Sequence, residues 1–208
     1  MFATKSKNIM PSDLDQAFEQ AREQDLKAVA AIHRQIFSTT LSGQLGERFL
    51  EEYYRKIKIS PGGIVIVCEN KGQVIGFISG LSSKDNFLFP LLIKNVWSIL
   101  KELAVHPTIF KNIFRFIKRS LVLKEGKFNA ELMALAVLEE YRGKGLASGL
   151  VARMEEFFVS KNVKEYKVFT DLKSSTGYGF YEKSGFRLFQ EVDLLGVQAR
   201  LYFKTITF

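Results

Sequence analysis

The chain has 208 residues, slightly more than the usual length of one domain, so one core with an insertion is expected rather than two independent domains. The composition is 47% hydrophobic and 25% charged with only four prolines, which excludes a disordered, collagen-like or low-complexity chain. The single cysteine, Cys68, excludes an internal disulfide, and with only two histidines few metal ligands are available. The net charge of +8 favours anionic partners.

The first quarter of the chain is predicted to contain an extension, a short strand and two helices. Residues 1–17 mix charges and turn formers without periodicity and are predicted to be a flexible extension. They lack the basic-then-apolar order of a signal peptide, so a cytoplasmic location is expected. A short strand is predicted over 18–22, followed by helices over 25–37 and 44–56 with apolar residues at helical spacing.

The middle and end of the chain alternate strands with helices. Two β-branched runs, 64–68 and 74–79, flank an Asn-Lys-Gly turn and predict a hairpin. Beyond residue 127 the apolar pattern predicts strands over 131–137, 166–170, 186–192 and 199–206, and helices over 145–160 and 174–184. The order predicts one mixed α/β domain over residues 18–208, with a central twisted sheet flanked by helices.

A basic insertion is predicted over residues 84–127. It holds nine Lys or Arg against three Asp or Glu, a net charge of +6, and two helices are expected at about 91–104 and 109–123. Charged residues interrupt its apolar part, so a membrane span is not expected. Three uses stay open: a lid over an anionic acceptor, contact with an acidic membrane surface, and packing on the core or on a second subunit of a homodimer. Nucleic acid is not expected, because no known binding fold accompanies the charge.

The segment most informative about chemistry joins the strand at 131–137 to the helix at 145–160. Gly143 and Gly145 let the backbone approach a ligand, and a helix beginning there directs free N–H groups and the positive end of its dipole at it. A dinucleotide fingerprint would need glycine at 148, where Ser148 stands, and a Walker loop would need glycine at 138, where Leu138 stands. Both motifs are therefore excluded.

The pattern Arg-x-x-Gly-x-Ala, formed by Arg142, Gly145 and Ala147, resembles the acyl-CoA pyrophosphate loop of the GNAT acyltransferase superfamily. A second block, 180–186, resembles the same superfamily's helix-end signature at the expected distance. The resemblance covers roughly residues 18–83 and 128–206 and implies a GNAT-like fold. It also implies an N-acetyltransferase that uses acetyl-CoA as acyl donor, with no metal.

The resemblance further implies which residues bind the cofactor. The strands at 131–137 and 166–170 would splay apart, so that main-chain groups of Ala136, Val137 and Leu138 bind the pantetheine arm. The backbone of the loop would bind the pyrophosphate through Arg142, Gly143, Lys144, Gly145, Leu146 and Ala147. Ser174 stands where an asparagine often contacts the cofactor in that superfamily.

Catalysis by direct attack of an amine through a tetrahedral intermediate needs a base, an oxyanion donor and an acid. Glu131 is the candidate base, expected to share a face with Met133, Leu135 and Val137 by strand alternation; a solvated charge is the alternative. A backbone N–H near Val137 or Leu138 would stabilise the oxyanion. Tyr181 matches the superfamily's acid, with a core aromatic as the alternative reading.

The acceptor is expected to be the primary amine of a small, anionic molecule such as an amino sugar or a nucleotide-linked amino sugar. A protein N-terminus or lysine is a second enzymatic option, and a non-catalytic module that binds CoA or a membrane surface is a third. His33 lies on the apolar side of the first helix, in the region that lines acceptor sites in the resembled superfamily, but is expected to be a packed histidine. Cys68 is expected to be a small buried hydrophobe.

Overall fold

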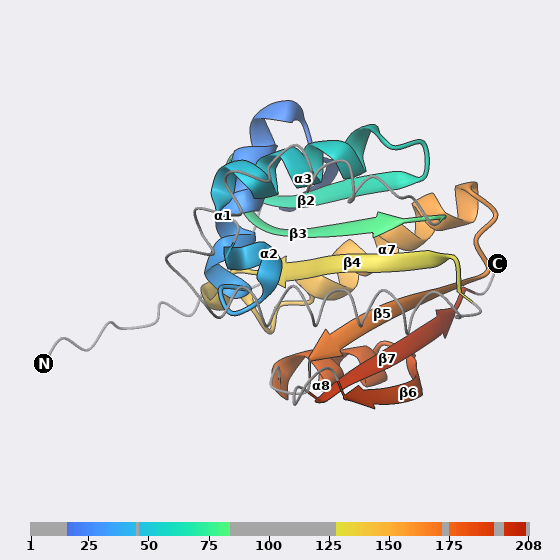
Figure 1. Cartoon of the computed structure of the whole chain (residues 1–208). Coiled ribbons are helices and arrows are strands. Elements are labelled where there is room, and N and C mark those ends of the chain that lie inside the picture. Colours follow the sequence, from blue (N-terminus) through green and yellow to red (C-terminus); the bar gives the residue numbers. More distant parts are fainter. Residues whose placement is uncertain (1–15, 45, 84–127, 172–174, 194–197, 207–208) are drawn as a thin grey trace, which may run out of the picture.

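One mixed sheet organises the computed structural model, which describes residues 16–44, 46–83, 128–171, 175–193 and 198–206 (Figure 1). Its order is β1-β2-β3-β4-β5-β7-β6, and of these contacts only that between β4 and β5 is parallel. The strands are β1 Gln16–Gln20, β2 Gly63–Asn70, β3 Gln73–Leu81, β4 Ala130–Val137, β5 Glu165–Asp171, β6 Arg187–Asp193 and β7 Gln198–Thr205. The predicted insertion 84–127, Ser174 and residues 1–15 of the predicted extension lie outside the described residues.

The helices are α1 Leu26–Ile36, α2 Leu41–Gln44, α3 Glu47–Ile59, α7 Leu146–Ser160 and α8 Ser175–Lys183, with 3-10 turns η2 Glu23–Asp25 and η3 Glu139–Tyr141. Helices α1, α3 and α7 each bury one apolar stripe. In α7, for example, Leu146, Leu150, Met154 and Phe158 recur every four residues and are all buried. No helix among the described ranges has the length and apolarity needed to cross a lipid bilayer.

The prediction of a mixed α/β fold is confirmed. Every helix and strand predicted within the described residues is present, with its ends within three residues of those expected. The differences are at boundaries: β1 begins at Gln16, inside the predicted extension, because Gln16 and Ala17 pair with β2 although they add no apolar periodicity. The short helix α2 lies where only a loop was expected.

The sheet separates two helical layers. A Cβ on Gly80 of β3 would lie 2.8 Å from Sδ of Met154, so α7 packs closely on that face. On the opposite face, Phe77 of β3 contacts the rings of His33 in α1 and Tyr54 in α3. Figure 1 shows the same arrangement, with α1 and α3 together on one side of the sheet and α7 on the other. We refer to these as the α7 face and the α1/α3 face.

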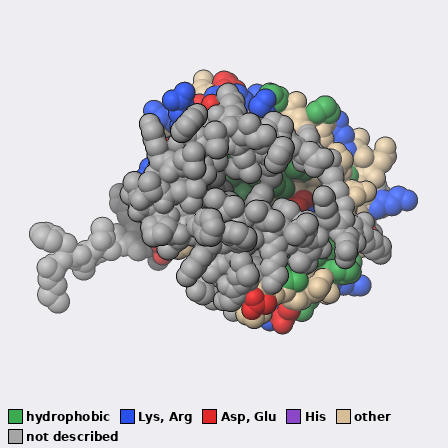
Figure 2. Space-filling view, viewed as in Figure 1, with side chains coloured by type: hydrophobic (Ala, Val, Ile, Leu, Met, Phe, Trp, Pro, Cys, Tyr) green, Lys and Arg blue, Asp and Glu red, His purple; other side chains and the backbone are tan. Residues whose placement is uncertain are grey.

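The outer surface of α3 is charged rather than apolar. Arg55 pairs with Glu51 one turn earlier and with Glu23 of η2, at 2.7 and 2.5 Å. Basic and acidic side chains both lie along the upper rim of the molecule, with a few hydrophobic ones between them (Figure 2). Exposed pairs of this kind contribute little to stability, but they keep the helix surface soluble.

Candidate active site

Strands β4 and β5 are paired at one end only. Their register joins Ala130, Glu131 and Leu132 to residues 166–168 of β5. Both strands continue beyond this point, β4 as far as Val137 and β5 as far as Asp171. The two strands therefore form a fork that opens toward their carboxyl ends, as the resemblance implied.

A β-bulge lies at the root of this fork. In the antiparallel register with β3, Gly80 pairs with Leu132 but the preceding Ser79 pairs with Ala134, which leaves Met133 as an extra residue on β4. A bulge bends its strand and increases the local twist. Because pairing with β5 stops at Leu132, directly before Met133, the bulge gives a physical reason for the divergence of the two strands.

The main-chain groups of β4 that face the fork are those of alternate residues. The N–H of Leu138 donates to the carbonyl oxygen of Ile75 in β3 at 2.9 Å. Since N–H groups alternate along a strand, that of Ala136 also points to β3, while those of Leu135 and Val137 point toward the fork. Of the main-chain groups expected to be unpaired around Ala136, Val137 and Leu138, the N–H of Leu138 is therefore bonded to β3. The N–H groups that face the fork are those of Leu135 and Val137.

The loop after β4 has the conformation that its glycines allow. Gly143 and Gly145 have φ angles of +75° and +81°, in the left-handed region that L side chains rarely adopt. Helix α7 begins at Leu146 without a side-chain cap, so its first N–H groups have no partner from a capping side chain. The ring of Phe18 in β1 would lie 2.6 Å from a Cβ on Gly149, so this helix start is held tightly against the sheet.

Two basic side chains flank this turn. Arg142 is exposed, and its Nε donates to the carbonyl oxygen of Val137 at 3.0 Å. Lys144 donates from Nζ to the carbonyl oxygen of Glu140 at 3.2 Å and lies 5.3 Å from the centre of the Tyr141 ring. Positive charge and the uncapped start of α7 therefore meet at the open end of the fork, an arrangement that attracts a diphosphate.

Tyr181 lies on the α7 face. It is 8% exposed and contacts the rings of Phe186 and Tyr202 at 5.2 and 6.3 Å. Tyr202 is the register partner of Val168, which in turn pairs with Leu132 at the root of the fork. Burial raises the pKa of the Tyr181 hydroxyl above its usual value, so the group stays protonated at neutral pH.

Glu131 lies on the other face of the sheet. Its register partner on β3 is Leu81, whereas that of Leu135 is Ile78, three residues away, and paired residues of antiparallel strands share a face. The expectation that Glu131 shares a face with Leu135 and Val137 is therefore wrong, because the bulge adds one residue and shifts the alternation. Glu131 is partly buried and forms an ion pair with Lys167 of β5, with 3.7 Å between Nζ and Oε2.

His33 and Cys68 are both buried. The Nδ1 atom of His33 is hydrogen-bonded to the hydroxyl of Tyr54, and burial lowers the pKa of His33 to about 4. A histidine of α1 that is neutral at pH 7 and packed between that helix and the sheet fits the expected structural role. Cys68 has no exposed surface, and burial raises the pKa of its thiol to about 11, which agrees with a small buried hydrophobe.

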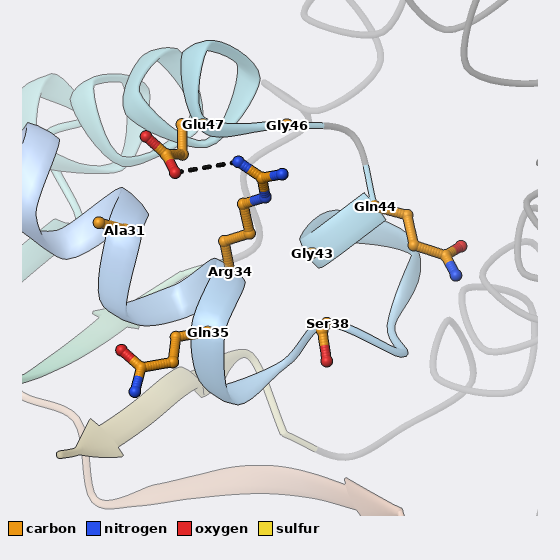
Figure 3. A pocket seen from close by; sticks show the side chains of 8 residues that line it. All are labelled: Ala31, Arg34, Gln35, Ser38, Gly43, Gln44, Gly46 and Glu47. Carbon is orange, nitrogen blue, oxygen red and sulfur yellow. Dashed lines mark hydrogen bonds and ion pairs between the residues drawn. The ribbon is translucent and has the colours of Figure 1, made fainter. Parts of the chain in front are cut away.

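A polar hollow of about 540 Å³ lies beside α1, where Arg34 pairs with Glu47 of α3 at 3.0 Å (Figure 3). Its other lining residues are Ala31, Gln35, Ser38, Gly43, Gln44 and Gly46. The α1 residues that line it are on the side of the helix opposite to its buried stripe. Because α1 itself separates this hollow from the fork, we assign it no part in the reaction.

The chain is similar to a known protein family and to several solved structures. The model of the acetyltransferase (GNAT) family matches residues 26–186. An N-acetyltransferase from Staphylococcus aureus Mu50 superposes with a TM-score of 0.63 at 16% identity, over 92% of this chain and 98% of that one. YncA from Salmonella typhimurium, solved with acetyl-CoA, gives 0.62 at 12% identity, covering 91% and 93%.

A spermidine N-acetyltransferase from Vibrio cholerae has a TM-score of 0.57 at 14% identity and covers 91% of this chain and 93% of its own. No curated protein matches the chain. Within the described ranges, no three His, Cys, Asp or Glu side chains are close enough together to hold a metal ion.

Proposed function

The chain belongs to the acetyltransferase (GNAT) family, and from this premise we propose that it transfers the acetyl group of acetyl-CoA to the primary amine of a small acceptor. One observation carries the proposal: β4 directs the main-chain groups of Leu135 and Val137 into a fork that leads to the uncapped start of α7. A strand whose N–H groups point into the fork suits an amide-rich chain, and the helix start suits a diphosphate.

The shape of acetyl-CoA fits these parts in order. The pantetheine arm would extend the sheet by bonding to the main chain at Val137, with Ala136 and Leu138 beside it. The diphosphate would accept hydrogen bonds from the N–H groups of Gly143, Lys144, Gly145, Leu146 and Ala147. The N–H of Arg142, expected from the sequence to join them, is bonded to the carbonyl oxygen of Glu139 at 3.1 Å, so Arg142 would contribute its side-chain charge instead. Ser174 remains a predicted contact from the sequence.

The N–H of Leu135 is the group that we assign to the oxyanion. A thioester carbonyl gains negative charge when an amine attacks it, and a fixed donor at that place lowers the barrier. The sequence indicated an N–H near Val137 or Leu138 for this role, but that of Leu138 is bonded to Ile75 and that of Val137 is assigned here to the pantetheine arm. Leu135 faces the fork and follows the bulge by two residues, so its N–H is directed at the space between the strands.

We assign the acid to Tyr181 and the base to Glu131. The two side chains lie on opposite faces of the sheet, with the fork between them. An amine that attacks from the α1/α3 face would lose its proton toward Glu131, and the CoA thiolate would leave toward the protonated hydroxyl of Tyr181. Opposite faces suit these roles, because the nucleophile and the leaving group occupy different sides of the carbonyl.

The acceptor is the finer part of the proposal. The net charge of +8 supports an anionic amine such as an amino sugar or a nucleotide-linked amino sugar. The Vibrio cholerae neighbour acts on spermidine, which is cationic, so the shared fold leaves the acceptor to the residues around the fork. The cytoplasmic location and the homodimer stay predictions of the sequence.

Replacement of Gly145 tests the proposal. Gly145→Ala forces a left-handed φ on a residue with a Cβ, although nothing lies within 4 Å of that Cβ, so the effect would come from the loop conformation alone. Calorimetric titration should show at least about a tenfold loss of affinity for acetyl-CoA, roughly 1.4 kcal/mol. Gly72→Ala is the matched control, because Gly72 has a φ of +76° and equally open space in the β2–β3 turn.

A panel of amines with detection of the released thiol then identifies the acceptor class. Amino sugars, their phosphates, spermidine and a peptide N-terminus would each be supplied with acetyl-CoA. Thiol release that depends on one amine supports an enzyme. Tight binding of acetyl-CoA with no release for any amine would favour a non-catalytic module, and no binding at all would overturn the assignment of the fork.

A further inference from the structure

Lys167 is a buried lysine at the root of the fork. Only 4% of the residue is exposed, and its neighbour across β7 in the sheet register is Phe203. The ring of Phe203 stacks on Phe128 at 5.2 Å, so the surroundings of Lys167 on this side are aromatic. An ammonium group in such a place loses most of its hydration, which is unfavourable unless a counter-charge is near.

The counter-charge is Glu131. The two residues are register partners in the parallel ladder, and their side chains are 5% and 16% exposed, with Nζ and Oε2 3.7 Å apart. Replacing a buried ion pair with apolar residues is often neutral or stabilising, so stability alone gives a poor reason for this pair. The position of the pair suggests a different reason.

The pair occupies the last rung but one before the fork opens. The next rung, Leu132 with Val168, is the last one, and the bulge follows at Met133. At about 3.3 Å per residue, Glu131 lies on the order of 13 Å along the strand from Leu135. A carboxylate at this distance serves an amine at Leu135 only if its side chain is fixed in an orientation toward the fork, with water carrying the proton between them.

We propose that Lys167 is a positioning residue, which holds the carboxylate of Glu131 at the root of the fork in the orientation that its role as base requires. The inference rests on the proposed function. Lys167 itself would not touch the substrate: its part is to restrict the rotamers of Glu131 and keep that side chain on the α1/α3 face. The alternative is a purely structural clamp that keeps β4 and β5 together.

A double-mutant cycle separates the two roles. The variants are Lys167→Met, Glu131→Gln and the double variant, assayed with acetyl-CoA and the best acceptor of the amine panel, with thermal unfolding as a check of folding. A positioning role predicts that Lys167→Met lowers kcat by about tenfold or more, with the KM for acetyl-CoA changed less than about threefold. In the Glu131→Gln background the same change should alter kcat less than about twofold.

Lys167→Arg and Lys167→Gln keep the test decisive if the Met variant unfolds. Arginine retains the charge and should recover kcat to within about threefold, whereas glutamine should not. Equal losses of kcat in both Glu131 backgrounds, or a rise in the KM for acetyl-CoA as large as the fall in kcat, would show a clamp and overturn the inference. Absence of acetyl-CoA binding or thiol release by the wild type would instead refute the proposed function.

Discussion

Arg142 and Val137 are joined by a hydrogen bond that spans the turn between β4 and α7, with 3.0 Å between Nε and the main-chain oxygen. The carbonyl of Val137 faces the fork, because alternate main-chain groups of β4 bond to β3. Arg142 thus connects the strand to the loop, and its exposed guanidinium lies next to the start of α7. One side chain contributes both order and positive charge at the proposed diphosphate position.

Arg142→Ala should therefore weaken acetyl-CoA binding more than it weakens the fold. A hydrogen bond to a charged group contributes about 1.5–3 kcal/mol, so we expect Kd for acetyl-CoA to rise about tenfold or more, with the largest difference at low salt. Calorimetric titration at two salt concentrations measures both effects.

Arg153→Ala is the control for charge. Arg153 is an exposed residue of α7 that lies beyond the turn and pairs with Glu156. This variant should leave the Kd within about twofold. Equal weakening by the two variants would mean that general charge, and not the turn, binds the cofactor.

Tyr181→Phe should lower turnover and leave the complex with acetyl-CoA intact. The change removes only the hydroxyl, and the ring contacts with Phe186 and Tyr202 remain. General acid catalysis contributes typically 10²–10⁴-fold, so a fall in kcat of about a hundredfold is expected, with Kd for acetyl-CoA within about twofold.

The pH profile gives a second readout of the same variant. Because burial raises the pKa of Tyr181, its proton is retained well beyond neutral pH, and wild-type activity should show no loss up to about pH 9 from this group. A phenylalanine variant with wild-type kcat would remove Tyr181 from the mechanism.

Periodicity in the sequence predicted the elements well because each buried stripe is long. In α7 the apolar residues from Leu146 to Phe158 repeat over more than three turns, and no local irregularity interrupts them. The bulge at Met133 had no such signal: methionine is common in regular strands, and no glycine or proline marks the irregularity. Regular strand alternation therefore predicted the wrong face for Glu131. The extra residue, Met133, also lies where β4 and β5 diverge.

The fork-facing N–H groups could not be derived from side chains at all. Which main-chain groups of β4 are free depends on its ladder with β3, and only the bond from Leu138 to Ile75 reveals the phase of that ladder. The family resemblance indicated residues 136–138, and Leu135 was not among them. The ion pair with Lys167 was missed for a similar reason, since it depends on the parallel register with β5.

Gly80 of β3 should not tolerate a side chain. A Cβ there would lie 2.8 Å from Sδ of Met154 and 2.9 Å from Cζ of Phe158, so both α7 side chains would have to move. Overpacking of this kind costs about 1–3 kcal/mol, and Gly80→Ala should lower the urea midpoint accordingly.

Gly179→Ala provides the opposite case. Gly179 is in the interior of α8, and a Cβ at this position meets nothing within 4 Å. Alanine favours a helix over glycine by about 1 kcal/mol, so this variant should be as stable as the wild type or more stable. If Gly80→Ala were also neutral, the close approach of α7 to β3 would be wrong.

His33 should make the fold sensitive to acid. Its pKa is lowered by burial from 6.5 to about 4, so the unfolded chain binds a proton that the folded chain does not between these values. Stability from the neutral form is complete above pH 6.5 and decreases as the pH falls toward 4. Between pH 7.5 and 5 the wild type should lose about 2 kcal/mol from this group.

His33→Gln isolates that contribution, because glutamine does not titrate and can still bond to the Tyr54 hydroxyl. Urea unfolding at pH 7.5 and pH 5 gives the free energy of unfolding of both proteins. The wild type should lose about 2 kcal/mol more than the variant over this interval, a range in which most carboxylates stay ionised. A parallel decline of the two proteins would mean that His33 is accessible to protons in the folded state, and α1 would then not seal it against the sheet.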